Sequence, residues 1–151
     1  MTTIAVSTEF GAMACDLQIT YGGNVKMKTS SKILTIGGEV AESLFNCKSA
    51  LLGFSGNAGS WGAVVGWLSN PQGKPPKIKD IELLMLTSNK EILHSNSLTS
   101  WVGIKDKGFA IGSGGAYALA ALELGKSPKE AVAVACKRDV FSGMGVRSYQ
   151  I

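Results

Sequence analysis

The chain has 151 residues, of which 45% are hydrophobic and 17% are charged, and its formal net charge is +4. This composition excludes a disordered chain, and the length suits one domain, residues 1–151, with a real hydrophobic core. The lysine clusters that carry the positive charge have no interleaved aromatic residues, so we expect no nucleic-acid partner.

The cysteines indicate an intracellular protein. Cys15, Cys47 and Cys136 are an odd number of thiols without the spacing of a metal site, which is typical of reduced, mostly buried side chains. No signal peptide opens the chain, and no apolar stretch is long enough to cross a bilayer. We therefore expect a soluble cytoplasmic protein that binds neither a metal nor a cofactor and has no membrane partner.

The first half of the chain reads mostly as strands. Residues 2–7 alternate and are rich in β-branched side chains, and a turn at 9–11 joins them to a return strand over 12–15. Strands are also predicted over 32–36 and 40–45, joined by Gly37 and Gly38, and over 50–54. Apolar residues at helical spacing then predict a helix over 58–68 with Asn57 as its N-cap.

The second half combines strands with two helices. A hairpin is predicted over 81–87 and 91–94, and a strand over 109–111 leads into a helix over 116–124 that ends at Gly125. Ser127 to Glu130 form a capping box with proline at the first helical position, which predicts another helix. The tail, 146–151, is a final strand. Strands, one helix, strands, two helices and a strand indicate an α+β fold of sheet and helix layers.

Thr2 is the residue with the most specific chemistry. Removal of Met1 would leave a hydroxyl and a basic amine on one residue, a nucleophile that carries its own general base. Asp16 ends the return strand of the first hairpin, so it can lie close to Thr2. Taken singly, each has a plainer interpretation: Thr2 as an ordinary strand residue, Asp16 as a strand end and Lys32 as a solvated lysine.

Five short motifs occur in order along nearly the whole chain. They are Thr2-Thr3-Ile4-Ala5-Val6, Ala14-Cys15-Asp16, the stretch from Gly22 to Lys32, Gly112-Ser113-Gly114-Gly115, and Arg138-Asp139 followed by Ser142-Gly143. Together they resemble the proteasome β-subunit and HslV family of threonine peptidases, which are N-terminal nucleophile hydrolases. The resemblance implies a four-layer αββα sandwich, an active site at the edge of its sheets, and subunits assembled into stacked rings.

The resemblance also implies roles for individual residues. Thr2 would attack the substrate, while Lys32 would lower the proton affinity of the Thr2 amine and Asp16 would fix the direction of Lys32. The backbone amide of Gly56, in the turn before Asn57, would bind the developing oxyanion.

Further positions match the family around this centre. Ser113, Asp139 and Ser142 would hydrogen-bond around the amine, although Asp139 and Ser142 fit equally well as the cap and turn that end the last helix. Four residues occupy positions that resemble the first substrate pocket of the family: Ile19, Ser30, Leu34 and Gly53.

The chain departs from the family after the oxyanion turn, where the family has two helices and the chain has one, followed by the proline-rich residues 71–76. We therefore expect a reduced first helical layer, and an ATP-dependent unfoldase partner is doubtful. The implied function is a threonine endopeptidase that degrades peptides or unfolded proteins in a ring-shaped homo-oligomer. Two alternatives stay open: a non-catalytic ring-forming assembly protein of the same fold, and an N-terminal nucleophile amidase that cuts small amides.

Overall fold

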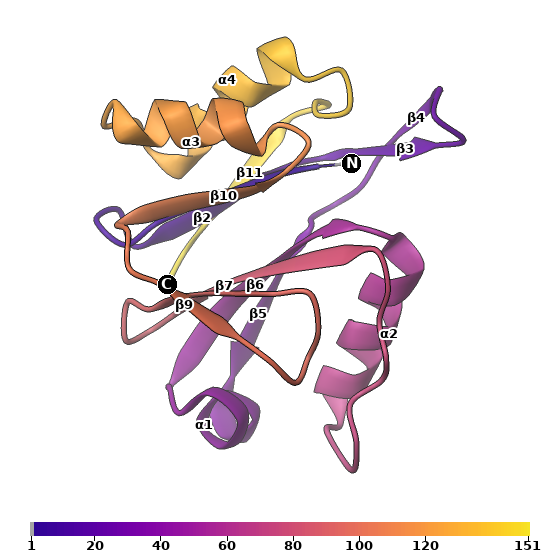
Figure 1. Ribbon diagram of the computed structural model, residues 1–151, viewed down its shortest axis with the longest axis vertical. Helices are drawn as coiled ribbons and strands as arrows, with labels where there is room; N and C mark the ends of the chain where they lie inside the picture. Colours follow the sequence, from indigo (N-terminus) through magenta and orange to yellow (C-terminus); the bar gives the residue numbers. More distant parts are fainter. Residues whose placement is uncertain (1) are drawn as a thin grey trace.

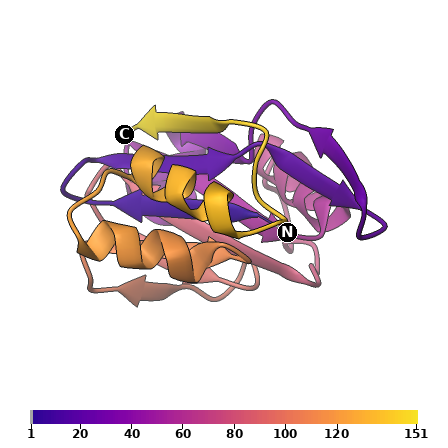
Figure 2. The ribbon, with the colours of Figure 1, turned by 90° about the horizontal axis from the view of Figure 1, so that it is seen from above.

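Two β-sheets form the centre of the structure, a computed structural model that describes residues 2–151. The first sheet has the order β10 (Gly108–Gly112), β1 (Thr3–Ser7), β2 (Ala12–Asp16) and β11 (Val146–Gln150). The second has the order β5 (Ile33–Gly37), β6 (Ser49–Gly56), β7 (Ile81–Thr87), β8 (Ile92–Ser95) and β9 (Val102–Ile104). A separate hairpin, β3 (Gln18–Tyr21) with β4 (Val25–Lys28), projects beyond the sheets (Figures 1 and 2).

The sheets lie face to face, and helices cover the outer face of each (Figure 1). α3 (Gly115–Glu123) and α4 (Pro128–Arg138) lie on the first sheet, while α1 (Gly38–Phe45) and α2 (Ala58–Ser69) lie on the second. Three apolar clusters fill the spaces between these four layers. The predicted αββα sandwich is therefore confirmed. No helix within residues 2–151 is long and apolar enough to cross a membrane.

Strand alternation assigns each central side chain to a layer. Ile4 and Val6 point into the space between the sheets, whereas Ala5, between them on β1, faces α3 and α4. The helix side of the first sheet is built mostly of alanines, so the helices approach closely. The two sheets also approach closely at Gly53, where a Cβ atom would lie 2.9 Å from Cγ2 of Ile4 and 3.2 Å from Sδ of Met13.

The two helices that were predicted from an N-cap residue begin where the sequence indicates. The Asn57 side chain accepts hydrogen bonds from the backbone amides of Gly59 and Ser60, which begins α2. At α4 the Ser127 hydroxyl accepts from the Glu130 amide and the Glu130 carboxylate accepts from the Ser127 amide. These bonds satisfy amides that the first helical turn leaves without partners.

The strand predicted over 40–45 is wrong, because Gly38–Phe45 is helix α1. Ala41 and Phe45, four residues apart, share the face that packs on the second sheet, and Asn46 ends the helix in the left-handed conformation, with φ of 52°. A single helix, α2, follows β6, as expected, but α1 gives the first helical layer a second, short member. The β3–β4 hairpin and β9 were not predicted either.

We expect the substitution Gly53→Ala to lower the free energy of unfolding by about 1–3 kcal/mol, because the added methyl group overpacks the space between the sheets. Gly66→Ala in α2 is the matched control. A Cβ atom there meets nothing within 4 Å, so alanine should stabilise the exposed helix by about 0.5–1 kcal/mol. Urea unfolding of both variants measures the difference, and a destabilised Gly66→Ala with an unaffected Gly53→Ala would contradict this account of the packing.

Candidate active site

The candidate site lies at one end of the sandwich, where strand pairing brings distant segments together. The start of β1 lies beside the end of β2 and the end of β10, because both pairings are antiparallel. Thr2 precedes β1, Asp16 ends β2 and Ser113 follows β10, so three chain segments meet there. Lys32 precedes β5 and brings in the second sheet, with its carbonyl oxygen accepting from the Phe54 amide of β6.

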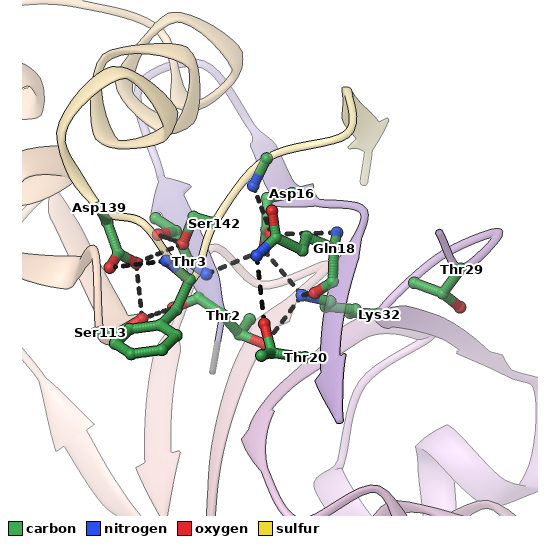
Figure 3. A network of polar contacts seen from close by, with 12 residues as sticks. Thr2, Thr3, Asp16, Gln18, Thr20, Thr29, Lys32, Ser113, Asp139 and Ser142 are labelled. Carbon is green, nitrogen blue, oxygen red and sulfur yellow. Dashed lines mark hydrogen bonds and ion pairs between the residues drawn. The ribbon is translucent and has the colours of Figure 1, made fainter. Parts of the chain in front are cut away.

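The Lys32 ammonium group is the centre of the site (Figure 3). Its Nζ lies 2.9 Å from Thr2 Oγ1 and 2.9 Å from Asp16 Oδ1, and it also donates to the backbone carbonyl of Gln18. These three acceptors match the three protons of an ammonium group. Lys32 is only 1% exposed, so a charge that would be costly to bury alone is fully hydrogen-bonded.

Asp16 is equally well satisfied. Oδ1 accepts from Lys32 and from the Thr3 amide at 3.0 Å, while Oδ2 accepts from the amides of Gln18 at 3.1 Å and Gly143 at 3.0 Å. The carboxylate is fully buried, and these donors replace the water that it loses. Four donors from separate segments also fix its orientation, and through it the direction of the Lys32 side chain.

This geometry has a chemical consequence for Thr2, which is itself buried. Since Lys32 donates to Oγ1, the Thr2 hydroxyl accepts there and keeps its own proton for another acceptor. A cation 2.9 Å from Oγ1 also stabilises an alkoxide at that oxygen. The predicted removal of Met1 concerns a residue outside the described part of the chain and stays a prediction.

A second carboxylate, Asp139, ends α4 beside this centre (Figure 3). Its Oδ2 lies 2.6 Å from the hydroxyl oxygens of both Ser113 and Ser142. Because an ionised carboxylate only accepts, both serines donate to it, and Ser142 must then accept from the Thr3 hydroxyl at 2.7 Å. Ser113 Oγ lies 3.4 Å from the carbonyl oxygen of Thr2. The structure therefore brings Ser113, Asp139 and Ser142 together against residues 2 and 3.

Gly56 lines a cavity of about 330 Å³ together with Thr2 and Lys32. Its φ of +115° and the close approach of the Asp80 carbonyl leave no room for a side chain. Of the four predicted pocket positions, only Ile19 lines the cavity. Gly53 instead faces the space between the sheets, and Leu34 lines a different cavity beside α1 and α2.

Two other glycines are required for the segments to approach. At Gly112, with φ of +92°, a Cβ atom would collide with the carbonyl group of Thr2. At Gly114 a Cβ atom would collide with the Thr3 hydroxyl and lie 3.0 Å from Cβ of Ala135. The glycine-rich turn predicted from the sequence therefore allows β10 and α3 to close over the start of β1.

The two thiols near the site, Cys15 and Cys136, have raised pKa values. Burial raises the pKa of the Cys15 thiol, and burial together with the charge of Asp16 raises the pKa of Cys136 to about 11. Residues 2–151 also contain no group of three or more histidine, cysteine, aspartate or glutamate side chains that could hold a metal ion.

Two residues of the network were missed by the sequence reasoning. The Thr3 amide and hydroxyl connect Asp16 to Ser142, and the Gln18 carbonyl accepts from Lys32. The second threonine of the Thr2-Thr3 pair was a visible signal, because successive residues of a strand point to opposite faces of the sheet, so two threonines place a hydroxyl on each face. The Gln18 contact uses a backbone atom, which leaves no mark in the sequence.

No family model and no curated protein matches the chain. Solved structures do match. Thiobacillus denitrificans BPH in complex with epoxomicin has 17% identity, covers 98% of this chain and 97% of its own, and gives a TM-score of 0.67. Eukaryotic HslV from Trypanosoma brucei has 20% identity, with 98% of each chain covered and a TM-score of 0.67. Anbu (ancestral beta-subunit) from Yersinia bercovieri has 11% identity, covers 98% of this chain and 80% of its own, and gives a TM-score of 0.71. At these identities the likeness shows the fold alone, and the chain has the fold of the HslV and Anbu structures.

Proposed function

We propose that the protein is a threonine endopeptidase that cuts peptides or unfolded proteins once Met1 has been removed. The observation that carries this proposal is the hydrogen-bonded chain from Asp16 through Lys32 to Thr2, with both steps at 2.9 Å in a buried setting. A buried ion pair is a poor source of stability, because apolar residues of similar size often stabilise a core as well or better. Here the lysine of the pair donates to a threonine hydroxyl that lines an open cavity, so a role in catalysis explains the pair better than a role in stability.

The first half of the reaction forms an ester. The Thr2 hydroxyl proton passes to the Thr2 amine as Oγ1 attacks the carbonyl carbon of the scissile amide, and Lys32 stabilises the developing negative charge on Oγ1. The carbonyl oxygen becomes an oxyanion that accepts a hydrogen bond from the Gly56 amide. The tetrahedral intermediate collapses and the C–N bond breaks. The protonated Thr2 amine gives its extra proton to the departing amine of the substrate.

The second half of the reaction releases the acyl product. A water molecule gives a proton to the Thr2 amine and attacks the ester carbon, a second oxyanion forms at Gly56, and Oγ1 leaves with the proton. Ser113, Asp139 and Ser142 hold residues 2 and 3 in place through hydroxyl and carboxylate hydrogen bonds. No cofactor takes part in either half of this scheme.

We propose that the peptidase works as a homo-oligomer of stacked rings in the cytoplasm. Large apolar side chains are exposed in two regions that suit contacts between copies: the β3–β4 hairpin and the outer side of α3, α4 and the following turn. They are Tyr21, Val25 and Met27 in the first region and Tyr117, Leu124, Val134, Val140 and Met144 in the second. An ATP-dependent unfoldase stays doubtful, since α2 is followed by an extended connection rather than a second helix.

Labelling by a peptide epoxyketone such as epoxomicin tests the proposal most directly. An epoxyketone has two electrophilic centres, so it can react with a hydroxyl and an amine of one residue. We expect intact mass spectrometry to show a chain without Met1 that gains one inhibitor, and Thr2→Ala to gain none. Thr2→Ser, which keeps both groups, is the control and should still react. A chain that retains Met1 and is never labelled would favour the assembly protein, and cleavage of small amides without cleavage of peptides would favour the amidase.

The substitution Asp16→Asn should lower both stability and activity. It leaves the Lys32 charge buried with a neutral partner, and breaking a buried pair in this way costs about 3–5 kcal/mol of unfolding free energy. Lys107→Met, which removes an exposed pair with Glu9 at 3.5 Å, should change that energy by less than about 1 kcal/mol. Urea unfolding and epoxomicin labelling at a temperature where both variants are folded measure the effects. Equal stability losses in the two variants would contradict the proposed coupling.

Alkylation tests whether a thiol competes with Thr2. Since the pKa of Cys136 is raised to about 11, its thiolate at pH 8 should be roughly a hundredfold scarcer than that of an ordinary cysteine. Iodoacetamide should therefore react slowly at pH 8 and about tenfold faster for each unit of pH up to 10. Peptide mapping follows the site, with Cys136→Ser as the control. Rapid alkylation at pH 8 that also blocks epoxomicin would contradict a threonine nucleophile.

A further inference from the structure

The C-terminal segment, residues 139–151, contacts Asp16 of the proposed catalytic chain and Thr3, the neighbour of Thr2. Ser142 accepts from the Thr3 hydroxyl, and the Gly143 amide donates to Asp16. Strand β11 then runs beside β2, starting with Val146 opposite Asp16. These contacts explain how residues 3 and 16 are held, but Lys32 precedes the second sheet and needs a separate connection.

Tyr149 supplies that connection. It lies on β11 opposite Met13, and its ring packs in the apolar layer between the sheets. Its hydroxyl donates to Oγ of Ser31 at 2.8 Å. Ser31 Oγ also accepts from the Ile33 amide at 3.1 Å and lies 3.2 Å from the Ile33 carbonyl oxygen. The tyrosine thus fixes a side chain that bridges the two neighbours of Lys32.

We propose that Tyr149 is a positioning residue for Lys32, so that the last strand of the first sheet holds the lysine of the second sheet against Thr2. This inference rests on the proposed function. Lys32 has further backbone restraints, because its carbonyl accepts from Phe54 and the Thr29 amide donates to Leu17. Those bonds hold the segment at its ends, whereas the tyrosine acts on the residue directly before Lys32.

Loss of the tyrosine hydroxyl has a defined chemical consequence. Lys32 Nζ lies 2.9 Å from the Thr2 hydroxyl oxygen, and a cation there lowers the proton affinity of the neighbouring amine. If Lys32 moves away, the apparent pKa of the trimmed amine rises toward its ordinary value of about 7.7–8.0. The pH at which the reaction rate of Thr2 falls off on the acidic side then moves upward. The other titratable groups around the amine keep their places in this account: Cys15 and Asp16 on β2, Tyr21 on β3, Cys136 on α4 and Asp139 after it.

The test is Tyr149→Phe, measured as the rate of epoxomicin modification between pH 6 and pH 9. A displacement of reacting groups by a fraction of an ångström to one ångström lowers rates by about 10- to 100-fold. We expect a loss in that range, with the acidic fall-off displaced upward by about half a pH unit or more. Ser31→Ala should reproduce both effects. Ser43→Ala, the same substitution as Ser31→Ala at an exposed serine of α1, is the matched control and should behave as the wild type.

The pH profile separates positioning from mere support of the fold. A Tyr149→Phe variant that melts at a lower temperature but keeps the wild-type profile would overturn the inference. If the wild type does not react at any pH, the proposed function fails and the ¹³Cε resonance of Lys32, assigned with Lys32→Arg, becomes the readout. A changed resonance in Tyr149→Phe then upholds the connection to Lys32, and an unchanged one overturns it.

Discussion

The buried pair of Asp16 and Lys32 joins the two sheets, and much of the rest of the structure serves it. Neither charge could be buried alone at acceptable cost. Burial is possible because three amides reach the carboxylate, while a carbonyl and a hydroxyl reach the ammonium group. The donors and acceptors come from the ends of strands, so the sheets must align at this edge before the pair is satisfied. The pair therefore fixes how one sheet lies on the other as well as what the site can do.

Small residues make this alignment possible. Gly53 lets the sheets approach, while Gly112 and Gly114 let the turn after β10 pass over residues 2 and 3. On the outer face, alanines of β1 and β2 meet alanines of α3 and α4. Close packing of the first sheet with its helices brings Asp139, at the end of α4, within hydrogen-bond distance of the two serines. The hydrogen bonds of the site therefore depend on the close packing that these small residues allow.

Much of this could be predicted from the sequence, and the failures have physical causes. Helices with side-chain caps at Asn57 and Ser127 were predicted correctly, because capping is a local interaction. Helix α1 was mistaken for a strand, because its N-cap, Gly37, has no side chain. The proposed catalytic residues were found through their order along the chain. Thr3, Gln18 and Tyr149 were not. Thr3 contacts residues that are distant along the chain, Gln18 uses a backbone atom, and Tyr149 reaches from the first sheet to the segment before the second.

The contact between Thr3 and Ser142 spans 139 residues of sequence. This contact cannot form before Ser142 has been synthesised and has left the ribosome. A nascent chain on the ribosome can present Thr2 long before it can complete the surroundings of Thr2. The order of the chain therefore completes the surroundings of Thr2 only after residues 139–142 have been synthesised and have folded against β1 and β2.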